Sequence, residues 1–272
     1  MKYKLVVTDM DGTLLNSEKK ISEGNLKTIK TLKSRGVKFV IATGRLDTMI
    51  KSYLKQIEND TPVICCNGAL IRNSLKNEFY YANDIDNESC LKVSEICNKY
   101  SVPFILYCEE TVYSNSVNFK IKSLYDYNSK VSDEYKVKIR ITSDIFNEVN
   151  GKERIFKILV IIDDNKLFEQ VKNEINSLEG LVAYKSDVNF LDVMHSGVDK
   201  GDALNKLAQI MNISREEIIA IGDNHNDVGM LKNAGYSIAM ENGEKVAKDA
   251  ADYITCSNDE DGVAKALRIL NK

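Results

Sequence analysis

Short hydrophobic runs alternate with amphipathic stretches over the first third of the chain. The stretch 22–35 places Leu26, Ile29 and Leu32 on one face of a predicted helix. The other elements predicted here are a helix over 46–57 and continuous apolar strands over 4–8, 37–42 and 62–66. This order of elements, with strands that are apolar throughout, predicts a parallel sheet covered by helices on both faces.

The same alternation returns towards the end of the chain. Leu204, Leu207 and Met211 share one face of a helix predicted over 200–211. The remaining predicted elements are strands over 217–221, 236–240 and 252–255 and a helix over 262–270. We therefore expect both ends of the chain to build one α/β domain.

The middle of the chain has longer, more alternating strands that are separated by long polar stretches. The predicted strands cover 104–108, 110–114, 156–162 and 181–185, and the predicted helices cover 88–100 and 165–177. We interpret this segment as an α+β domain inserted into the α/β domain. The expected division is a core over 1–82, an inserted domain over 83–188 and the second part of the core over 189–272.

Composition and charge argue against a nucleic-acid-binding or membrane protein. The net charge is -3 and the basic residues are spread along the chain, so no basic nucleic-acid surface is expected. No segment approaches the ~20 apolar residues that a membrane helix needs, and the first residues lack the apolar stretch of a signal peptide. The six cysteines show no metal-binding spacing, and we interpret them as thiols in a reducing cytoplasm.

Two carboxylates end the first predicted strand. Asp9 and Asp11 stand two residues apart, and Gly12 follows with the freedom to turn sharply and bring backbone N–H groups close to an anion. Ligand sites of parallel α/β sheets lie at this carboxyl end of the strands. An ordinary polar turn is the alternative. It does not explain a second Asp so close to the first, which should repel it.

Two further positions carry groups that suit an anion. Thr43 and Gly44 lie where a predicted strand meets a helix, so a hydroxyl and a helix N-terminus would form a cradle for phosphate. A simple N-cap at Thr43 is the alternative. Lys200 stands in the first turn of a predicted helix, where the helix dipole disfavours a cation. An isolated lysine would be a surface residue. At Lys200, a bound phosphate or a nearby Asp would offset the unfavourable interaction between the ammonium charge and the helix dipole.

A further strand end carries the sequence Gly-Asp-Asn-His-Asn-Asp over 222–227. Asp223 and Asp227 would join Asp9 and Asp11 at one edge of the sheet, where four carboxylates could not all ionise without a cation. Mg²⁺ suits such a site because it prefers few carboxylates, several waters and the phosphate oxygens of a substrate. We interpret His225 as an exposed loop residue, since a single histidine is a weak metal signal.

Taken in order, these segments resemble the motifs of the haloacid dehalogenase superfamily. Residues 9–13 match its D-x-D-G-T motif, and 43–45 resemble the Thr-Gly-Arg form of its second motif. Lys200 lies in the setting of the third motif, and 222–227 match G-D-x-x-N-D. The resemblance implies a Rossmann-like parallel-sheet core with an inserted α+β cap domain of the C2 type.

The resemblance also assigns a role to each candidate residue. Asp9 would be the nucleophile that forms an aspartyl-phosphate, and Asp11 the general acid and base. A like charge nearby raises the pKa of a carboxyl group, so Asp11 could stay protonated and serve the leaving oxygen. Mg²⁺ would be held by the side chains of Asp9 and Asp223 and by the backbone carbonyl of Asp11. Asn224 and Asp227 would support these ligands without binding the ion directly. Phosphate would be bound by Met10, Thr43, Gly44, Lys200 and Asn226.

The inserted domain resembles the cap of the Cof-type subfamily IIB phosphatases, which implies that it selects the substrate. The turn at Asn67 and Gly68 is typical of this branch, although the same dipeptide forms ordinary hairpin turns. Residues 194–196 read Met-His-Ser where relatives often carry Met-Pro-Lys. We therefore do not expect the individual substrate of a relative to carry over unchanged.

We expect a Mg²⁺-dependent phosphatase that acts on small phosphorylated metabolites, such as sugar phosphates. The ion-pumping ATPases of the family carry Thr at the position of Asp11. The resemblance therefore implies that Asp11 favours rapid breakdown of the acyl phosphate, as in a phosphatase. A phosphomutase that returns the phosphoryl group to a bound sugar is the first alternative. A non-catalytic protein that binds phosphometabolites is the second, and it would be expected to carry a damaged first motif. No P-loop sequence occurs.

Overall fold

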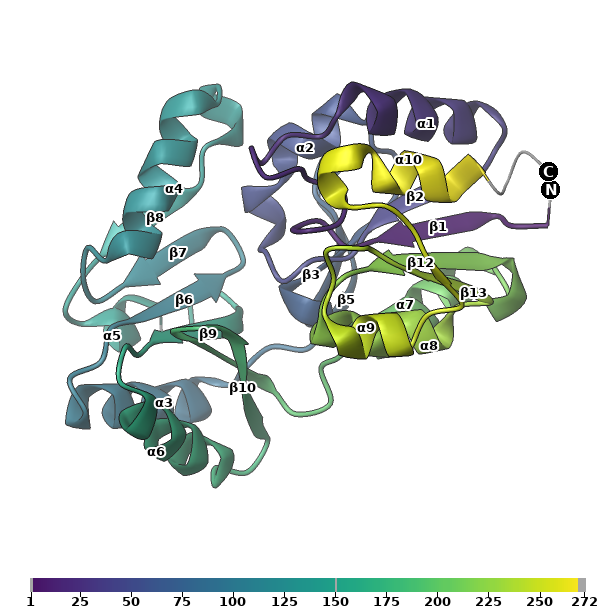
Figure 1. Cartoon of the computed structure of the whole chain (residues 1–272). Helices are drawn as coiled ribbons and strands as arrows, with labels where there is room; N and C mark the ends of the chain where they lie inside the picture. The colour runs from purple at the N-terminus through teal and green to yellow at the C-terminus, as the bar shows by residue number, and fades with distance from the viewer. Residues whose placement is uncertain (1, 150, 269–272) are drawn as a thin grey trace. The chain divides into compact units, whose positions relative to one another are not determined.

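The computed structural model describes residues 2–149 and 151–268, and it divides into two compact units (Figure 1). One unit consists of the residues up to Tyr81 together with those from Asp199 onward. The other unit is the continuous segment Ala82–Val198. We call them the core and the inserted unit.

The core is built on a five-stranded parallel sheet in which β1, Leu5–Thr8, occupies an inner position. All four residues of β1 are buried, because strands flank it on both edges and helices cover both faces. The strand order is β14-β13-β12-β1-β2. The other strands are β2 (Lys38–Ile41), β12 (Ile218–Gly222), β13 (Tyr236–Ala239) and β14 (Tyr253–Ile254).

Helices cover the two faces of this sheet. On one face, apolar side chains of α7 (Lys200–Met211), α8 (Val228–Asn233) and α9 (Lys245–Asp249) pack against those of β1, β2 and β12. Figure 1 shows α1 (Glu23–Ser34) and α10 (Gly262–Leu267) on the other face, where they contact each other. The helix expected over 46–57 is interrupted: a 3₁₀ turn, Asp47–Met49, precedes α2 (Lys51–Gln56). Residues 269 and 270 of the predicted last helix lie outside the described residues.

The third predicted strand turns back on itself. Ile64 in β3, Val63–Cys65, makes a parallel bridge to Ala42 just beyond β2, as a parallel sheet requires. The chain then reverses, and β4, Leu70–Asn73, pairs antiparallel with β3. Together with β5 (Glu78–Ala82) these strands form a three-stranded sheet. The dipeptide at Asn67 and Gly68 therefore does lie in a hairpin turn.

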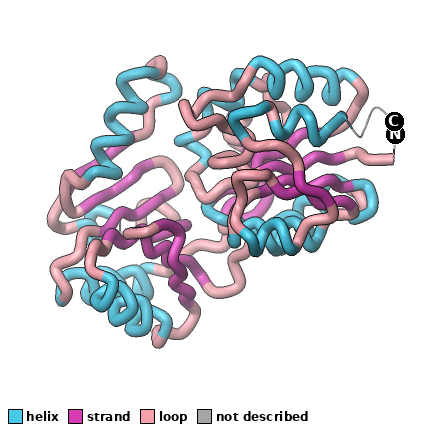
Figure 2. Tube along the Cα trace, viewed as in Figure 1, coloured by secondary structure: helices cyan, strands magenta, loops and turns pink. Residues whose placement is uncertain are grey.

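The inserted unit is a six-stranded sheet with helices packed on one face. The strand order is β10-β11-β9-β6-β7-β8, and α3 (Asn87–Lys99) and α6 (Asn165–Asn176) bury their apolar sides in one hydrophobic cluster with the sheet. Figure 2 shows the strands and helices of this unit along the Cα trace. The strands are β6 (Phe104–Cys108), β7 (Thr111–Ser114), β8 (Lys138–Ile141), β9 (Ile155–Ile161), β10 (Leu181–Asp187) and β11 (Phe190–His195). The remaining helices are α4 (Phe119–Lys130) and α5 (Ile145–Val149).

The inserted unit ends later than the boundary expected at residue 188. Strand β11 pairs antiparallel with both β9 and β10, so it is an internal strand of this sheet. The return to the core therefore follows β11, at Val198. The sequence predicts no strand over β11, because only a short turn separates it from β10 and its residues alternate weakly.

Candidate active site

Three strands of the core place their following residues at one edge of the sheet. Strand β1 pairs in parallel register with β2 and β12, and Thr8 lies opposite both Ile41 and Ile221. The pairing continues one residue further, because the N–H of Asp9 donates to the carbonyl of Ile221 at 2.8 Å. Residues that follow these strands therefore meet at the carboxyl edge, as the sequence predicted.

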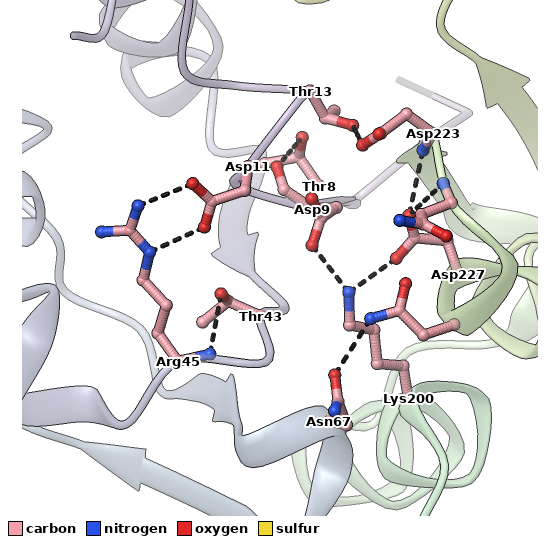
Figure 3. Close-up of polar contacts among 12 residues, drawn as sticks. Thr8, Asp9, Asp11, Thr13, Thr43, Arg45, Asn67, Lys200, Asp223 and Asp227 are labelled. Atoms are coloured by element: carbon pink, nitrogen blue, oxygen red, sulfur yellow. Dashed lines mark hydrogen bonds and ion pairs between the residues drawn. The ribbon is translucent and has the colours of Figure 1, made fainter. Parts of the chain in front are cut away.

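Lys200 joins two of the carboxylates at this edge (Figure 3). Its Nζ donates to Oδ1 of Asp9 at 2.6 Å and to Oδ1 of Asp227 at 2.7 Å. The Lys200 side chain is only 1% exposed. Burial would disfavour the ammonium group, but the charges of Asp227 and Asp9 outweigh it and hold the pKa of Lys200 above its usual range. The surface alternative for this lysine is therefore wrong.

Asp227 also fixes the loop that follows β12. Its second oxygen, Oδ2, accepts the backbone N–H groups of Asp223 at 2.9 Å and Asn224 at 3.0 Å. The Asn224 side chain turns towards its own loop and accepts the N–H of His225. One buried carboxylate thus holds both Lys200 and the backbone that carries Asp223. The ring of His225 stays exposed, as expected of a loop residue.

Asp223 lies directly against the turn that follows Asp11. The hydroxyl of Thr13 donates to Oδ1 of Asp223 at 2.6 Å. Gly12 has a φ of +83°, and a Cβ atom there would lie 2.5 Å from Oδ2 of Asp223. Only glycine meets both conditions. Burial and the charge of Asp227 raise the pKa of Asp223 to about 6.

Three carboxylates form a group that could hold a metal ion. Asp9, Asp223 and Asp227 each offer an oxygen, and these atoms lie within 4.8 Å of one another. Burial raises the pKa of Asp9 well above its usual range, and the charges of Asp227 and Asp223 add to this effect, while Lys200 opposes it. A divalent cation would relieve this crowding of negative charge, and an all-oxygen donor set suits Mg²⁺. This group of carboxylates contains Asp227, whereas the third ligand expected from the sequence was the main-chain carbonyl of Asp11.

The Asp11 carboxylate is instead bound by two cations. Arg45 donates to it from Nε at 2.7 Å and from a terminal nitrogen at 2.6 Å, and Nζ of Lys19 lies 3.1 Å away. Figure 3 shows the carboxylate turned towards Arg45 and away from Lys200. Burial would raise the pKa of Asp11, but Arg45 and Lys19 outweigh it and hold that pKa well below its usual range. The expectation that Asp11 stays protonated beside Asp9 is therefore wrong for this state, because neighbouring cations decide its charge.

The expected phosphate-binding residues lie around the same edge. Thr43 is buried, and its hydroxyl accepts the backbone N–H of Arg45 at 3.1 Å, so it caps the turn after β2. Met10 is buried, and its carbonyl accepts the N–H of Leu15 at 2.9 Å. The side chain of Asn226 donates to Oδ1 of Asn67 at 3.0 Å, which ties the last motif to the β3–β4 turn.

Asn67, like Arg45 and Lys19, makes a side-chain contact that the sequence did not predict. Its asparagine-glycine pair was compatible with a hairpin alone, and a hairpin is what β3 and β4 form. Only the three-dimensional structure shows that its side chain meets Asn226, which stands 159 positions later in the chain.

Comparisons with known proteins show the family of this chain. The family model of the haloacid dehalogenase-like hydrolases matches residues 6–267. The 5-amino-6-(5-phospho-D-ribitylamino)uracil phosphatase YwtE of Bacillus subtilis is 29% identical over 276 residues, which cover 96% of each chain. No helix of the described residues is long and apolar enough to cross a membrane.

Solved structures share the whole fold. A haloacid dehalogenase-like hydrolase from Bacteroides thetaiotaomicron is 32% identical with a TM-score of 0.87, and the match covers 99% of this chain and 100% of that one. The subclass IIB sugar phosphatase BT4131 is 27% identical with a TM-score of 0.82, covering 98% of this chain and 99% of that one. The chain therefore belongs to the haloacid dehalogenase-like hydrolases, as a phosphatase of their subclass IIB.

Proposed function

We propose that the protein hydrolyses phosphate monoesters of small metabolites and that Asp9 is the nucleophile. The observation that carries this proposal is the contact between Asp9 and Lys200: a buried ammonium group holds Oδ1 of the carboxylate at 2.6 Å. The other oxygen, Oδ2, would attack phosphorus, forming an O–P bond as the bond to the ester oxygen breaks. Water would then hydrolyse the aspartyl-phosphate and release inorganic phosphate, which splits one difficult step into two easier ones.

Mg²⁺ fits the carboxylates at this edge. We expect Asp9 and Asp223 to hold it, together with the main-chain carbonyl of Asp11. When bound, the ion would neutralise negative charge on the phosphoryl oxygens. Asp227 would keep its present contacts and hold Asp223 and Lys200 in place, since both of its oxygens are engaged.

The transferring phosphoryl group would be bound by groups from three loops and from the first turn of α7. The ammonium of Lys200 would bind it by charge. The Thr43 hydroxyl and the backbone N–H groups of Met10 and Gly44 would donate hydrogen bonds to its oxygens. The side-chain amide of Asn226 would add one more donor. These groups are preorganised by the contacts described above, so little reorganisation is needed when the phosphorus becomes five-coordinate.

Asp11 would donate a proton to the leaving oxygen and later take one from the attacking water. It cannot do so while Arg45 holds it as an ionised carboxylate. The acid role therefore requires the contact with Arg45 to break when substrate binds. A guanidinium that leaves Asp11 is then free to bind another acceptor, such as an oxygen of the substrate.

The substrate class is proposed from two relatives. One is named for hydrolysing a phosphorylated ribityl compound and the other as a sugar phosphatase. Both names describe phosphate monoesters of small polyhydroxylated molecules, and we propose the same class here. We further propose that the inserted unit, Ala82–Val198, selects the leaving group.

A phosphate-release assay over a panel of such esters tests the proposal. Purified protein with Mg²⁺ should release inorganic phosphate from at least one sugar phosphate or related monoester, and Asp9→Asn should not. A phosphomutase would instead interconvert isomers, require a bisphosphate activator and release little free phosphate. Absence of both activities over a broad panel would contradict the proposal.

A further inference from the structure

The turn that joins β3 to β4 is buried and left-handed. Cys66 has a φ of 48°, Asn67 of 55° and Gly68 of 108°, and the Asn67 side chain is 2% exposed. Ordinary hairpin tips are exposed, whereas this one lies inside the core. Two consecutive non-glycine residues in the left-handed region persist only where their surroundings hold them there.

Backbone hydrogen bonds fasten this turn to the second motif. The N–H of Asn67 donates to the carbonyl of Thr43 at 3.0 Å, and the N–H of Cys66 donates to the carbonyl of Arg45 at 3.0 Å. The turn is therefore bonded on both sides of Gly44. A Cβ atom on Gly44 would lie 2.9 Å from Oδ1 of Asn67, so the missing side chain at 44 leaves room for the amide.

The turn also reaches the third and fourth motifs. A Cβ atom on Gly68 would collide with the carbonyl oxygen of Asp199, the residue before Lys200. Oδ1 of Asn67 accepts the Nδ2–H of Asn226 at 3.0 Å (Figure 3). One three-residue turn thus touches segments from three motifs that are far apart in the sequence.

The contact with Asn226 selects the orientation of an amide. An asparagine side chain can present either its NH₂ group or its oxygen to a neighbour. Because Oδ1 of Asn67 can only accept, it holds the NH₂ group of Asn226 on its own side. One hydrogen of that group binds Asn67, and the second remains to be donated to an anion.

We propose that Asn67 is a positioning residue that orients the Asn226 amide and the Thr43–Gly44 turn for binding the phosphoryl group. This inference rests on the proposed function, because it takes Asn226 and Gly44 as phosphate-binding groups. Without Asn67, the oxygen of Asn226 could turn towards the phosphate and repel it. Asparagine suits the position twice, since it tolerates the left-handed backbone and supplies the acceptor.

Substitution by glycine separates the two properties of this asparagine. Asn67→Gly keeps the left-handed backbone and removes the amide. Asn212→Gly is the matched control, because Asn212 is also left-handed, with a φ of 52°, and is exposed at the end of α7. Affinity for inorganic phosphate is measured by calorimetry with Mg²⁺ present, alongside kcat, KM and the melting temperature.

Asn67→Gly should weaken phosphate binding and lower kcat/KM by about tenfold, the effect expected of one lost hydrogen bond to an ordered polar group. Asn212→Gly should leave both within about twofold. In an Asn226→Ala background, Asn67→Gly should cost little more, because the two residues would act through one contact.

The inference would be overturned if Asn67→Gly bound phosphate and turned over substrate like the wild type while only its melting temperature fell. That result would make the turn purely structural and leave the proposed phosphatase function intact. Should Asn67→Gly not fold, unchanged phosphate affinity in a folded Asn226→Ala variant would overturn it equally. A wild-type protein that neither releases nor binds phosphate would overturn the proposed function and this inference together.

Discussion

Arg45 donates two hydrogen bonds, of 2.7 and 2.6 Å, to the carboxylate of Asp11, and this pairing keeps the predicted general acid ionised. The two residues stand 34 positions apart, at the ends of two neighbouring strands. A fork-shaped guanidinium matches both oxygens of a carboxylate, which makes the contact stronger than one from a lysine. Substrate-free protein therefore holds Asp11 in a state that it must leave before it can donate a proton.

Removing the guanidinium should lower stability in a pH-dependent way. The pKa of folded Asp11 lies below its unfolded value of about 3.9, so the pair stabilises the protein above that pH and the effect is lost as pH falls. Arg45→Ala should reduce the free energy of unfolding at pH 7 by about 1 kcal/mol, a modest figure because Asp11 is partly exposed. Urea unfolding at pH 7 and near pH 2 measures this. Arg140→Ala, at an exposed ion pair with Glu148, is the control and should change little. An equal loss for Arg45→Ala at both pH values would contradict the assigned cause.

Replacing the nucleophile should abolish turnover without unfolding the protein. Asp9→Asn keeps the size of the side chain and an oxygen that can accept from Lys200, but an amide does not attack phosphorus. We expect kcat to fall by roughly a thousandfold or more. Asp249→Asn, at an exposed helix position, is the control and should be fully active. Mass spectrometry of acid-quenched wild-type protein should find phosphate on the peptide that contains Asp9. Substantial activity of a folded Asp9→Asn variant would remove Asp9 from this role.

Magnesium should be required, and Asp223 should set its affinity. Excess chelator should stop phosphate release, and added Mg²⁺ should restore it. Asp223→Ala should raise the Mg²⁺ concentration for half-maximal activity by at least about tenfold, because few protein carboxylates hold this ion. Titration of activity against Mg²⁺ for both proteins measures the shift. Full activity in excess chelator is the result that counts against a metal-dependent mechanism.

The sequence predicted the core better than the inserted unit, for physical reasons. Strands such as β1 and β12 are buried on both faces, so they are continuous apolar runs that are easily identified. Strand β8 is mostly exposed and carries two basic residues, and helix α4 buries only Ile121 and Leu124. Their hydrophobic patterns are therefore weak, and neither was predicted.

The active site was also predicted only in part: the positions of its residues were predicted, but the charge of Asp11 was not. Spacing along the chain placed Asp9, Asp223 and Lys200 at one edge, because the parallel register of β1 and β12 determines where those residues lie. The charge of Asp11 could not be obtained this way. Its neighbour in sequence, Asp9, argued for a proton, whereas Arg45 and Lys19 reach it only in the folded chain. Tertiary contacts thus decided the electrostatics that local spacing left open.

Lys200 should be needed for stability as well as for phosphate binding. Lys200→Met keeps the length of the side chain but leaves Asp9 and Asp227 without their counter-charge in a buried place. The pKa of Lys200 is raised on folding, so its contribution is present in full at pH 7. We expect a loss of about 3 kcal/mol in chelator and a smaller loss with Mg²⁺, which would replace part of the missing charge.

Unfolding in both conditions tests this, with Lys245→Met as the control because Lys245 forms an exposed pair with Asp249. The control should change little. Equal losses for Lys200→Met with and without Mg²⁺ would show that no divalent cation shares these carboxylates.

Exchange of the inserted unit with that of a relative tests both its limits and its proposed role. Strand β11 lies between β9 and β10, so a junction at residue 188 would separate it from its sheet and expose the edges of both neighbours. Chimeras joined at residues 82 and 198 should therefore be folded and monodisperse, whereas those joined at 83 and 188 should aggregate. The folded chimera also tests the role of the unit. The order of kcat/KM over a panel of phosphate esters should move towards that of the protein that donated the unit. Asp9, Asp223 and Lys200 all belong to the core, so hydrolysis of a small activated ester should persist. An unchanged order of substrates in a well-folded chimera would place substrate selection in the loops of the core.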